Sequence, residues 1–272
     1  METTIKDDFS LNRIARSGQC FRVREFPDGT YRFVTGSHIL YIKETAPQQY
    51  EVSCDENEWQ NIWWDYFDFG RDYQSIRNSI PTVDSYMKVA AAEGNGIRIL
   101  RQDPWEMLIT FIISQRKSIP AIKNSIEMLC RTYGNLVHTD RETLWLFPSA
   151  EQLYQASDSR LQDCKLGYRI GYIRDAVAAV YEHRIDLSVI DHHDDIALFT
   201  ELKSIKGVGD KVANCICLFS YGRTSMAPVD TWISKIIDIH YKGINPFPAY
   251  GDAAGIMQQY AFFYAQNHKK EV

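Results

Sequence analysis

The feature that most limits the fold of this 272-residue chain is a change of sequence pattern near Gly96. Before it lie short segments rich in β-branched and aromatic residues, separated by turn-forming Pro, Asp and Gly, which predicts an antiparallel sheet of hairpins. The predicted strands are Cys20–Arg24, Tyr31–Thr35, Ile39–Ile42 and Tyr50–Ser53, and a helix-prone segment follows from Tyr73 to Ala92.

After Gly96, apolar residues recur with helical spacing, and Gly or Pro interrupts them at intervals. The predicted helices are Trp105–Ser114, Ile119–Tyr133, Asp140–Leu146, Ala150–Ala156, Asp158–Cys164, Tyr168–Glu182, Asp195–Lys203, Asp210–Ser220, Thr231–Tyr241 and Ala253–Gln266. We therefore expect an α+β protein, with an N-terminal antiparallel β-rich domain over residues 1–92 and an all-helical body over residues 93–272.

The overall charge limits the classes of partner. The chain carries 30 Lys and Arg against 35 Asp and Glu, a formal net charge of −5, which argues against an indiscriminate nucleic-acid binder. The negative excess is concentrated in residues 51–72 and 182–201, so the remainder of the chain is net positive. A focused basic surface on an acidic body is compatible with this pattern, and the affinity of such a surface for a polyanion should fall with salt.

Sequence signals for location and metal binding are absent. The longest apolar run, from Met107 to Ile113 and broken only by Thr110, is far too short to span a membrane, and the first residues lack a secretory or organelle signal. We expect a cytoplasmic protein with no signal peptide and no membrane partner, associated with the nucleoid if the source is bacterial. The six cysteines are scattered, and Cys215-x-Cys217 has no second pair nearby, so we expect reduced, mostly buried thiols and no metal site.

The most informative segment runs from Leu202 to Ala213 and places Gly207-Val208-Gly209 between two helical patterns. Glycines there permit a tight hairpin, and its free amide groups at the start of the next helix suit a phosphate. An isolated Gly-x-Gly, however, is more often an ordinary turn between helices that binds no ligand.

Two further residues give this segment a possible chemistry. Lys211 lies in the first turn of the predicted helix, where a cation is electrostatically misplaced, and its amine is a candidate nucleophile. Asp230 directly precedes another amphipathic segment. On its own it would be an ordinary N-cap, but a carboxylate at that place is also able to stabilise a developing cation or to manage protons.

These residues belong to a larger set of motifs that resembles a known family. The motifs are Ser17-Gly18-Gln19-Cys20-Phe21-Arg22, Gln102-Asp103-Pro104-Trp105-Glu106, Leu166-Gly167-Tyr168-Arg169, Gly207-Val208-Gly209-Asp210-Lys211, Val212-Ala213-Asn214-Cys215-Ile216-Cys217-Leu218 and Pro228-Val229-Asp230. The hairpin, the lysine and the aspartate resemble the helix–hairpin–helix DNA glycosylase superfamily, and the other motifs resemble its 8-oxoguanine DNA glycosylase family. The resemblance spans about residues 10–266 and implies two helical lobes with the active site between them.

The resemblance implies a base-excision-repair enzyme that flips 8-oxoguanine out of duplex DNA, removes it and nicks the strand. Lys211 would attack C1′ and form a Schiff base with the sugar, and Asp230 would stabilise the cationic transition state. Gly18 would accept the N7 hydrogen of the lesion through its carbonyl oxygen. The other residues implied for the base pocket are Cys215, Pro228, Gln258 and Phe262. Those implied for DNA binding are Arg116, Tyr168, Arg169, Lys206, Gly207, Val208, Gly209 and Trp232.

Three positions depart from the family pattern. Arg116 stands where an asparagine fills the gap left by the flipped base, Ala121 where an arginine reads the opposite cytosine, and Trp232 where a histidine contacts phosphate. Arg169 matches a second cytosine reader, and Tyr168 matches the wedge that kinks the duplex. With one reader missing, we expect a relaxed preference for the opposite base.

The expected partner is double-stranded DNA containing 8-oxoguanine, bound by a monomer. No cofactor is expected to be required for catalysis, and a monovalent cation at the hairpin is the one candidate ion.

Other functions stay open at this point. A glycosylase for a different damaged base would share the architecture, although branches with a four-cysteine cluster usually place it near the C-terminus and no cysteine follows Cys217. A non-catalytic helix–hairpin–helix protein would use the hairpin only to hold phosphate. An enzyme that forms a Schiff base between Lys211 and a small aldehyde is a third class, which no other motif supports.

Overall fold

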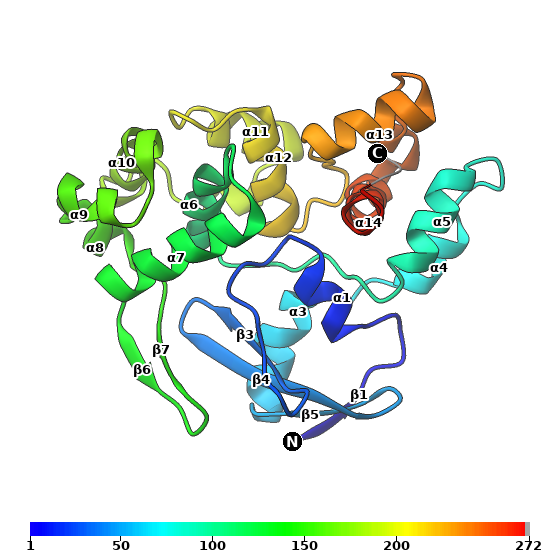
Figure 1. Ribbon diagram of the computed structural model, residues 1–272, viewed down its shortest axis with the longest axis horizontal. Coiled ribbons are helices and arrows are strands. Elements are labelled where there is room, and N and C mark those ends of the chain that lie inside the picture. Colours follow the sequence, from blue (N-terminus) through cyan, green and yellow to red (C-terminus); the bar gives the residue numbers. More distant parts are fainter. Residues whose placement is uncertain (270–272) are drawn as a thin grey trace. The chain divides into compact units, whose positions relative to one another are not determined.

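The computed structural model describes residues 1–269 and divides the chain into two compact units (Figure 1). The first unit comprises residues 1–34, 39–101 and the described chain from residue 222 onward, and the second comprises residues 35–38 and 102–221. The boundary predicted at residue 92 separates a β-rich from a helical sequence pattern, whereas these units are defined by compactness. The predicted boundary therefore stays a prediction.

The N-terminal region forms the antiparallel sheet that the sequence predicts (Figure 1). Its strands are β1 (Glu2–Thr4), β2 (Arg24–Glu25), β3 (Tyr31–Thr35), β4 (His38–Ala46) and β5 (Gln49–Val52), in the order β1-β5-β4-β3-β2. The prediction missed β1 and the short helix α1 (Leu11–Arg16), and the strand expected at Cys20–Arg24 is only Arg24–Glu25. Cys20 instead packs into the core below the sheet.

A cluster of aromatic side chains fills the space between this sheet and the chain that follows it. Many of these rings come from the π-helix Trp59–Trp63 and α3 (Trp64–Tyr66), which follow the short polar helix α2 (Glu56–Glu58). Trp63 and Phe67 are completely buried, and the Phe67 ring lies edge-on to Phe33 of β3 at 5.1 Å between centroids. Large buried aromatic rings dominate the energetics of such a core.

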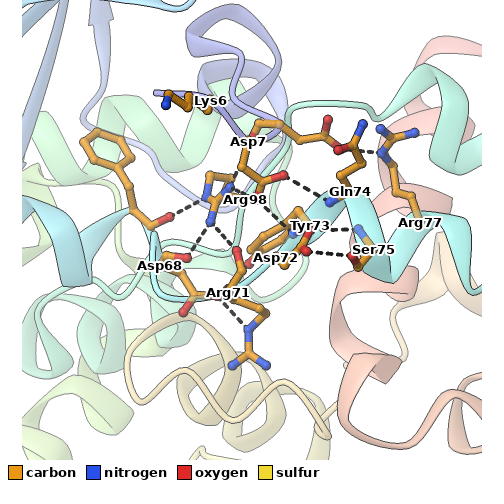
Figure 2. Close-up of polar contacts among 12 residues, drawn as sticks. Lys6, Asp7, Asp68, Arg71, Asp72, Tyr73, Gln74, Ser75, Arg77 and Arg98 are labelled. Atoms are coloured by element: carbon orange, nitrogen blue, oxygen red, sulfur yellow. Dashed lines mark hydrogen bonds and ion pairs between the residues drawn. The ribbon is translucent and has the colours of Figure 1, made fainter. Parts of the chain in front are cut away.

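Arg98 is a fully buried cation that ties three segments of the first unit together (Figure 2). Its guanidinium donates to Asp7 Oδ2 at 2.9 Å and to the backbone carbonyls of Asp8, Phe67, Asp68 and Arg71. Asp68, held at a positive φ of 52°, accepts from Tyr73, Arg71 and Arg101. A buried charge is tolerated only with such complete hydrogen bonding.

The C-terminal helices complete the first unit. They are α13 (Thr231–Tyr241), the 3₁₀ segment Phe247–Ala253 and α14 (Ala254–Asn267), and α14 packs against α5 (Ser85–Glu93). The predicted helix from Tyr73 to Ala92 is instead two helices, α4 (Tyr73–Asn78) and α5, because Pro81 interrupts it. Asp84 caps α5 and accepts from the Tyr241 and Tyr250 hydroxyls, which fixes α13 to α5.

The second unit is built around α6 (Pro104–Ser114), whose residues 106–113 are all buried. α6 packs against α7 (Ile119–Tyr133), α10 (Ile170–Tyr181) and α12 (Asp210–Phe219). The other elements are α8 (Ala150–Tyr154), α9 (Asp158–Asp163), the 3₁₀ turns Gly167–Arg169 and Ile190–His192, and α11 (Asp195–Lys203). Apart from one segment, the predicted helices of the body are present within a few residues of their expected ends.

The helix predicted over Asp140–Leu146 is wrong. The segment is part of a hairpin of β6 (Leu136–His138) and β7 (Thr143–Trp145), so the body is largely but not entirely helical (Figure 1). The Thr139 hydroxyl accepts from the Glu142 amide at 3.1 Å, and the Thr139 amide donates to the Glu142 carbonyl, which closes a tight turn. Within residues 1–269, none of the helices has the length and apolar character needed to cross a membrane.

Candidate active site

The predicted hairpin joins α11 to α12 in the second unit, and a close packing contact fixes its shape. Gly207 has a φ of 90°, and a Cβ added there would lie 2.3 Å from Cγ of Tyr172 on α10. Only glycine satisfies both conditions. The Gly207 carbonyl accepts from Gln115 Nε2 at 2.9 Å, and the Lys206 amide donates to Asp175 Oδ2 at 2.8 Å. The hairpin is therefore anchored on α6 and α10.

The N-terminus of α12 has backbone N–H groups that are available to a ligand. Its N-cap residue is Gly209, which brings no capping side chain, and the amides of Gly209, Asp210 and Lys211 have no hydrogen-bond acceptor within residues 1–269. Lys203 Nζ lies 2.5 Å from Asp210 Oδ1 and offsets the carboxylate beside these amides. Free amides at the positive end of a helix form an anion site.

Lys211 lies half-buried in the first turn of α12. Its Nζ is 5.1 Å from the centroid of the Phe111 ring on α6. Within the described chain it has no hydrogen bond or ion pair, so the amine is held by the aromatic face alone. Cys215, one turn later on the same face of α12, is buried with 3% of its surface exposed.

Asp230 is the N-cap of α13 in the first unit. Its Oδ1 accepts from the amides of Trp232 and Ile233 at 3.0 and 2.9 Å. Its Oδ2 has no hydrogen-bond partner among residues 1–269. The cap fixes the carboxylate with one oxygen while leaving the other available.

The first unit also holds the residues expected to line the base pocket, apart from Cys215. Gly18 has a φ of 80°, and its carbonyl accepts no hydrogen bond from the described residues. A buried network fixes the turn around it, because Gln19 bonds Ser17, Arg98 and Leu100. Gln259 of α14 donates to the Ser17 carbonyl. Sequence reasoning missed Gln19 and Gln259, although Gln19 lies inside a motif that it singled out.

Gln258 and Phe262, both expected to line the base pocket, lie on α14. Gln258 is buried, with 4% of its surface exposed, and its Oε1 has no hydrogen-bond partner within residues 1–269. Such a group is costly unless something else satisfies it. Phe262 is half-buried one turn further along the same helix. Pro228 is buried, and Trp232, half-buried in the first turn of α13, lies under Lys235 Nζ at 5.5 Å.

The remaining predicted DNA contacts lie in the second unit. Arg116 is exposed in the turn between α6 and α7, and Tyr168 has 56% of its surface exposed. Val208 is buried, whereas Lys206 and Gly209 are exposed. Arg169 has only 6% of its surface exposed, and its guanidinium is bonded to backbone carbonyls. Among residues 1–269, no group of three or more potential metal ligands is present.

Comparison with known protein families shows to which family a chain with this arrangement belongs. Residues 3–108 match the family described as "8-oxoguanine DNA glycosylase, N-terminal domain", and residues 109–251 match "HhH-GPD superfamily base excision DNA repair protein". The chain belongs to the 8-oxoguanine DNA glycosylase family. The family and the fold class predicted from the sequence are thereby confirmed.

Two solved structures of this family are similar over nearly the whole chain. MBOgg1 in complex with a low-affinity DNA ligand is 34% identical with a TM-score of 0.92, covering 98% of this chain and 96% of that one. The Clostridium acetobutylicum 8-oxoguanine glycosylase/lyase in complex with double-stranded DNA containing cytosine opposite 8-oxoguanine is 32% identical with a TM-score of 0.91, covering 99% and 98%.

A curated relative carries an enzymatic name. The N-glycosylase/DNA lyase of Saccharomyces cerevisiae is 31% identical over 177 residues, which is 60% of this chain but only 46% of the yeast protein. The chain therefore spans less than half of that relative. The predicted enzyme class, a DNA N-glycosylase and lyase, agrees with the names of these relatives.

Proposed function

We propose that this member of the 8-oxoguanine DNA glycosylase family removes 8-oxoguanine from double-stranded DNA and cleaves the backbone at the resulting site. The observation that carries the proposal is Lys211, a half-buried amine without an ion pair in the described chain, directly after a hairpin with unused amide donors. A phosphate on those amides would fix the register of the DNA backbone relative to the lysine.

Lys211 supplies the nucleophile in the proposed chemistry. The damaged nucleotide leaves the base stack, because C1′ is inaccessible inside a duplex. The amine attacks C1′, the glycosidic bond breaks with its electrons on the base, and opening of the sugar gives a Schiff base. The imine acidifies the C2′ proton, whose loss expels the 3′ phosphate by β-elimination. Asp230 stabilises the positive charge that develops on the sugar through the oxygen that its cap leaves available.

In the proposed site, the polar groups of Gly18 and Gln258, which have no hydrogen-bond partner in the described chain, recognise the base. 8-Oxoguanine carries a hydrogen on N7, where guanine has only an acceptor, and the carbonyl of Gly18 would accept it. The unpartnered amide of Gln258 would bond the Watson–Crick edge, and Phe262 and Cys215 would stack on the two faces of the base. A site built to satisfy a hydrogen bond discriminates strongly against the base that lacks it.

Recognition of the opposite base is expected to be relaxed. Ala121 has no side chain able to read a base edge, so Arg169 is the only arginine at the two positions that match the opposite-base readers of the family. Losing one good base contact costs roughly 1–3 kcal/mol of discrimination. We therefore expect excision opposite all four bases at rates within about tenfold of each other.

The decisive experiment is borohydride trapping on an 8-oxoguanine duplex, with each of the four opposite bases. The wild-type protein should form a covalent adduct, and Lys211→Gln should form none because it has no amine. Lys88→Gln, on the exposed face of α5, is the matched control and should trap normally. An adduct with Lys211→Gln would overturn the assignment of the nucleophile.

The same assay separates the alternatives. A non-catalytic DNA-binding protein would shift the duplex in a binding assay without excision or trapping. A glycosylase for a different base would leave 8-oxoguanine intact and act on another lesion in a panel of duplexes. We propose that no cofactor takes part and that the protein acts as a monomer. A cation at the hairpin would appear as a stronger affinity for DNA in potassium than in tetramethylammonium salt.

A further inference from the structure

The turn between α6 and α7 and the segment between α9 and α10 each place one non-glycine residue in the left-handed backbone region. In the turn Arg116 has a φ of 52°, and in the segment Lys165 has a φ of 58°. A residue with a Cβ adopts this conformation at a cost in free energy, so contacts from elsewhere in the fold are needed to maintain it. The side chain of Lys117 makes such a contact between the two places.

Lys117 directly follows Arg116 and is half-buried. Its Nζ donates to the Lys165 carbonyl at 2.6 Å and to Oγ of the fully buried Ser125 on α7 at 2.5 Å. Its amide donates to the carbonyl of Ser114, the last residue of α6, at 3.1 Å. Lys117 therefore joins the turn to α7 and to the segment between α9 and α10, all within the second unit.

The surroundings of this ammonium group are electrostatically unfavourable. In the described chain it has no carboxylate partner. Burial lowers the pKa of Lys117, and the charges of Arg169 and Lys165 lower it further. The two hydrogen bonds of Nζ offset part of this cost because their donor is charged. They use two of its three N–H groups inside the protein, whereas the side chain of Arg116 is exposed.

The two places that Lys117 joins carry side chains expected to enter the duplex. Arg116 is exposed in the turn, and Tyr168, which follows Lys165 in the segment, has 56% of its surface exposed. In the proposed function, Arg116 fills the gap left by the flipped base and Tyr168 kinks the duplex. Groups that are already ordered before binding lose less conformational entropy when they bind. A fixed distance between the two backbone segments would therefore favour entry of both side chains.

We propose that Lys117 is a positioning residue, whose bond to the Lys165 carbonyl fixes the turn with Arg116 relative to the segment with Tyr168. The bond favours binding of DNA that is opened at one base. Binding of undamaged duplex depends mainly on phosphate contacts and does not require it. This inference rests on the proposed function and extends it to a residue that the family motifs do not assign.

The test compares affinity for an undamaged duplex with affinity for the same sequence carrying an uncleavable tetrahydrofuran abasic analogue. Lys117→Met keeps the length of the side chain and removes the donor. It should lower the preference for the abasic duplex about fivefold, a typical coupling between contacting residues, and leave affinity for the undamaged duplex nearly unchanged. In a Tyr168→Ala background the same substitution should change the preference by no more than about twofold, because one of the side chains that Lys117 positions is absent.

A spectroscopic readout separates positioning from a general loss of stability. The base analogue 2-aminopurine, placed beside the abasic site, gains fluorescence when its neighbours unstack. At saturating protein, Lys117→Met should give a smaller gain than wild type although all the DNA is bound. Ser125→Ala removes the other acceptor of Nζ and should show the same pattern with a smaller effect. It serves as the test if Lys117→Met does not fold.

Lys165→Met is the matched control. It removes a cation from the same place, but the backbone carbonyl that Lys117 bonds remains, and the exposed Lys165 side chain makes no bond in the described chain. The preference for the abasic duplex should stay within about twofold of wild type, and the 2-aminopurine signal should be unchanged.

Three results would count against these assignments. An unchanged preference in Lys117→Met would overturn the inference. A salt dependence whose slope falls by about one, with equal losses for both duplexes, would identify Lys117 as a phosphate contact and overturn it as well. Wild-type protein that binds the abasic duplex no better than the undamaged duplex would instead overturn the proposed function, and this inference with it.

Discussion

Two helix N-termini of this protein have opposite designs. α12 begins at Gly209 without a capping side chain, and its first amides have no acceptor within residues 1–269. α13 begins at Asp230, whose Oδ1 takes two amides and whose Oδ2 has no partner in the same described chain. The N-terminus of α12 leaves its backbone N–H groups available to an anion from outside the chain. The N-terminus of α13 uses its N–H groups to bind the Asp230 carboxylate.

A third helix N-terminus, that of α4, has its first-turn amides bonded to side chains of the protein itself. The first turn of α4 is capped twice, by Asp72 on the Ser75 amide and by Asp7 on the amides of Tyr73 and Gln74 (Figure 2). Nothing there is left for a ligand. A helix N-terminus is thus a candidate site only when an N–H group of its first turn or an oxygen of its cap has no partner. In the described chain α12 and α13 meet this condition and α4 does not.

The largest effect should come from removing the charge of the α13 cap. Asp230→Asn keeps an oxygen for the two amides, so the helix should stay capped, but the negative charge is lost. We expect the single-turnover excision rate to fall on the order of a hundredfold or more, with little change in melting temperature.

Asp194→Asn is the control for that change, because Asp194 caps α11 in the same manner through the Ala197 amide. It should leave the excision rate close to that of wild type. If Asp230→Asn retained full activity, the available oxygen of this cap would have no part in the chemistry.

The second effect comes from giving α12 the cap that it lacks. A Cβ at Gly209 would meet nothing within 4 Å, and its φ of −91° suits any residue. Gly209→Asp should therefore fold, bond its own amides and repel phosphate, which weakens DNA binding about tenfold. Gly209→Ala adds the Cβ without the carboxylate and should bind nearly as well as wild type. Equal affinity for Gly209→Asp and wild type would show that the amides do not hold DNA.

Both candidate N-termini, those of α12 and α13, were predictable from the sequence because the features that define them are local. The hairpin follows from Gly207 and Gly209 between two apolar periodicities, and Asp230 immediately precedes a third. The family motifs then assigned chemistry to Lys211 and Asp230.

What the sequence did not predict depends on contacts between distant residues. The segment Asp140–Leu146 has acceptable helix formers, but pairing of β6 with β7 and the Thr139 turn override them. Arg169 donates to the Gln115 carbonyl, 54 residues away, and Gln259 donates to the Ser17 carbonyl across 242 residues. No sequence spacing encodes either contact.

The smallest effect concerns α4 and depends on pH. Burial alone would raise the pKa of Asp7, but hydrogen bonds from Arg98 and the Tyr73 amide outweigh it, so the pKa lies below the usual 3.8. The stabilisation from the carboxylate is therefore complete above the unfolded-state pKa and is lost as the pH falls from 3.8 through the folded-state value. Asp7→Asn should lower the free energy of unfolding at neutral pH by about 1 kcal/mol, a typical value for such bonds.

Denaturant unfolding of Asp7→Asn and wild type, measured from pH 7 down to the acid limit, checks this directly. The difference between the two proteins should shrink as the pH falls below the usual aspartate range, because wild-type Asp7 is then protonated as well. Excision of 8-oxoguanine at neutral pH should be unaffected, since this N-terminus is closed to ligands. A difference that stayed constant with pH would mean that the double cap stabilises α4 by shape and hydrogen bonding alone, without help from its charge.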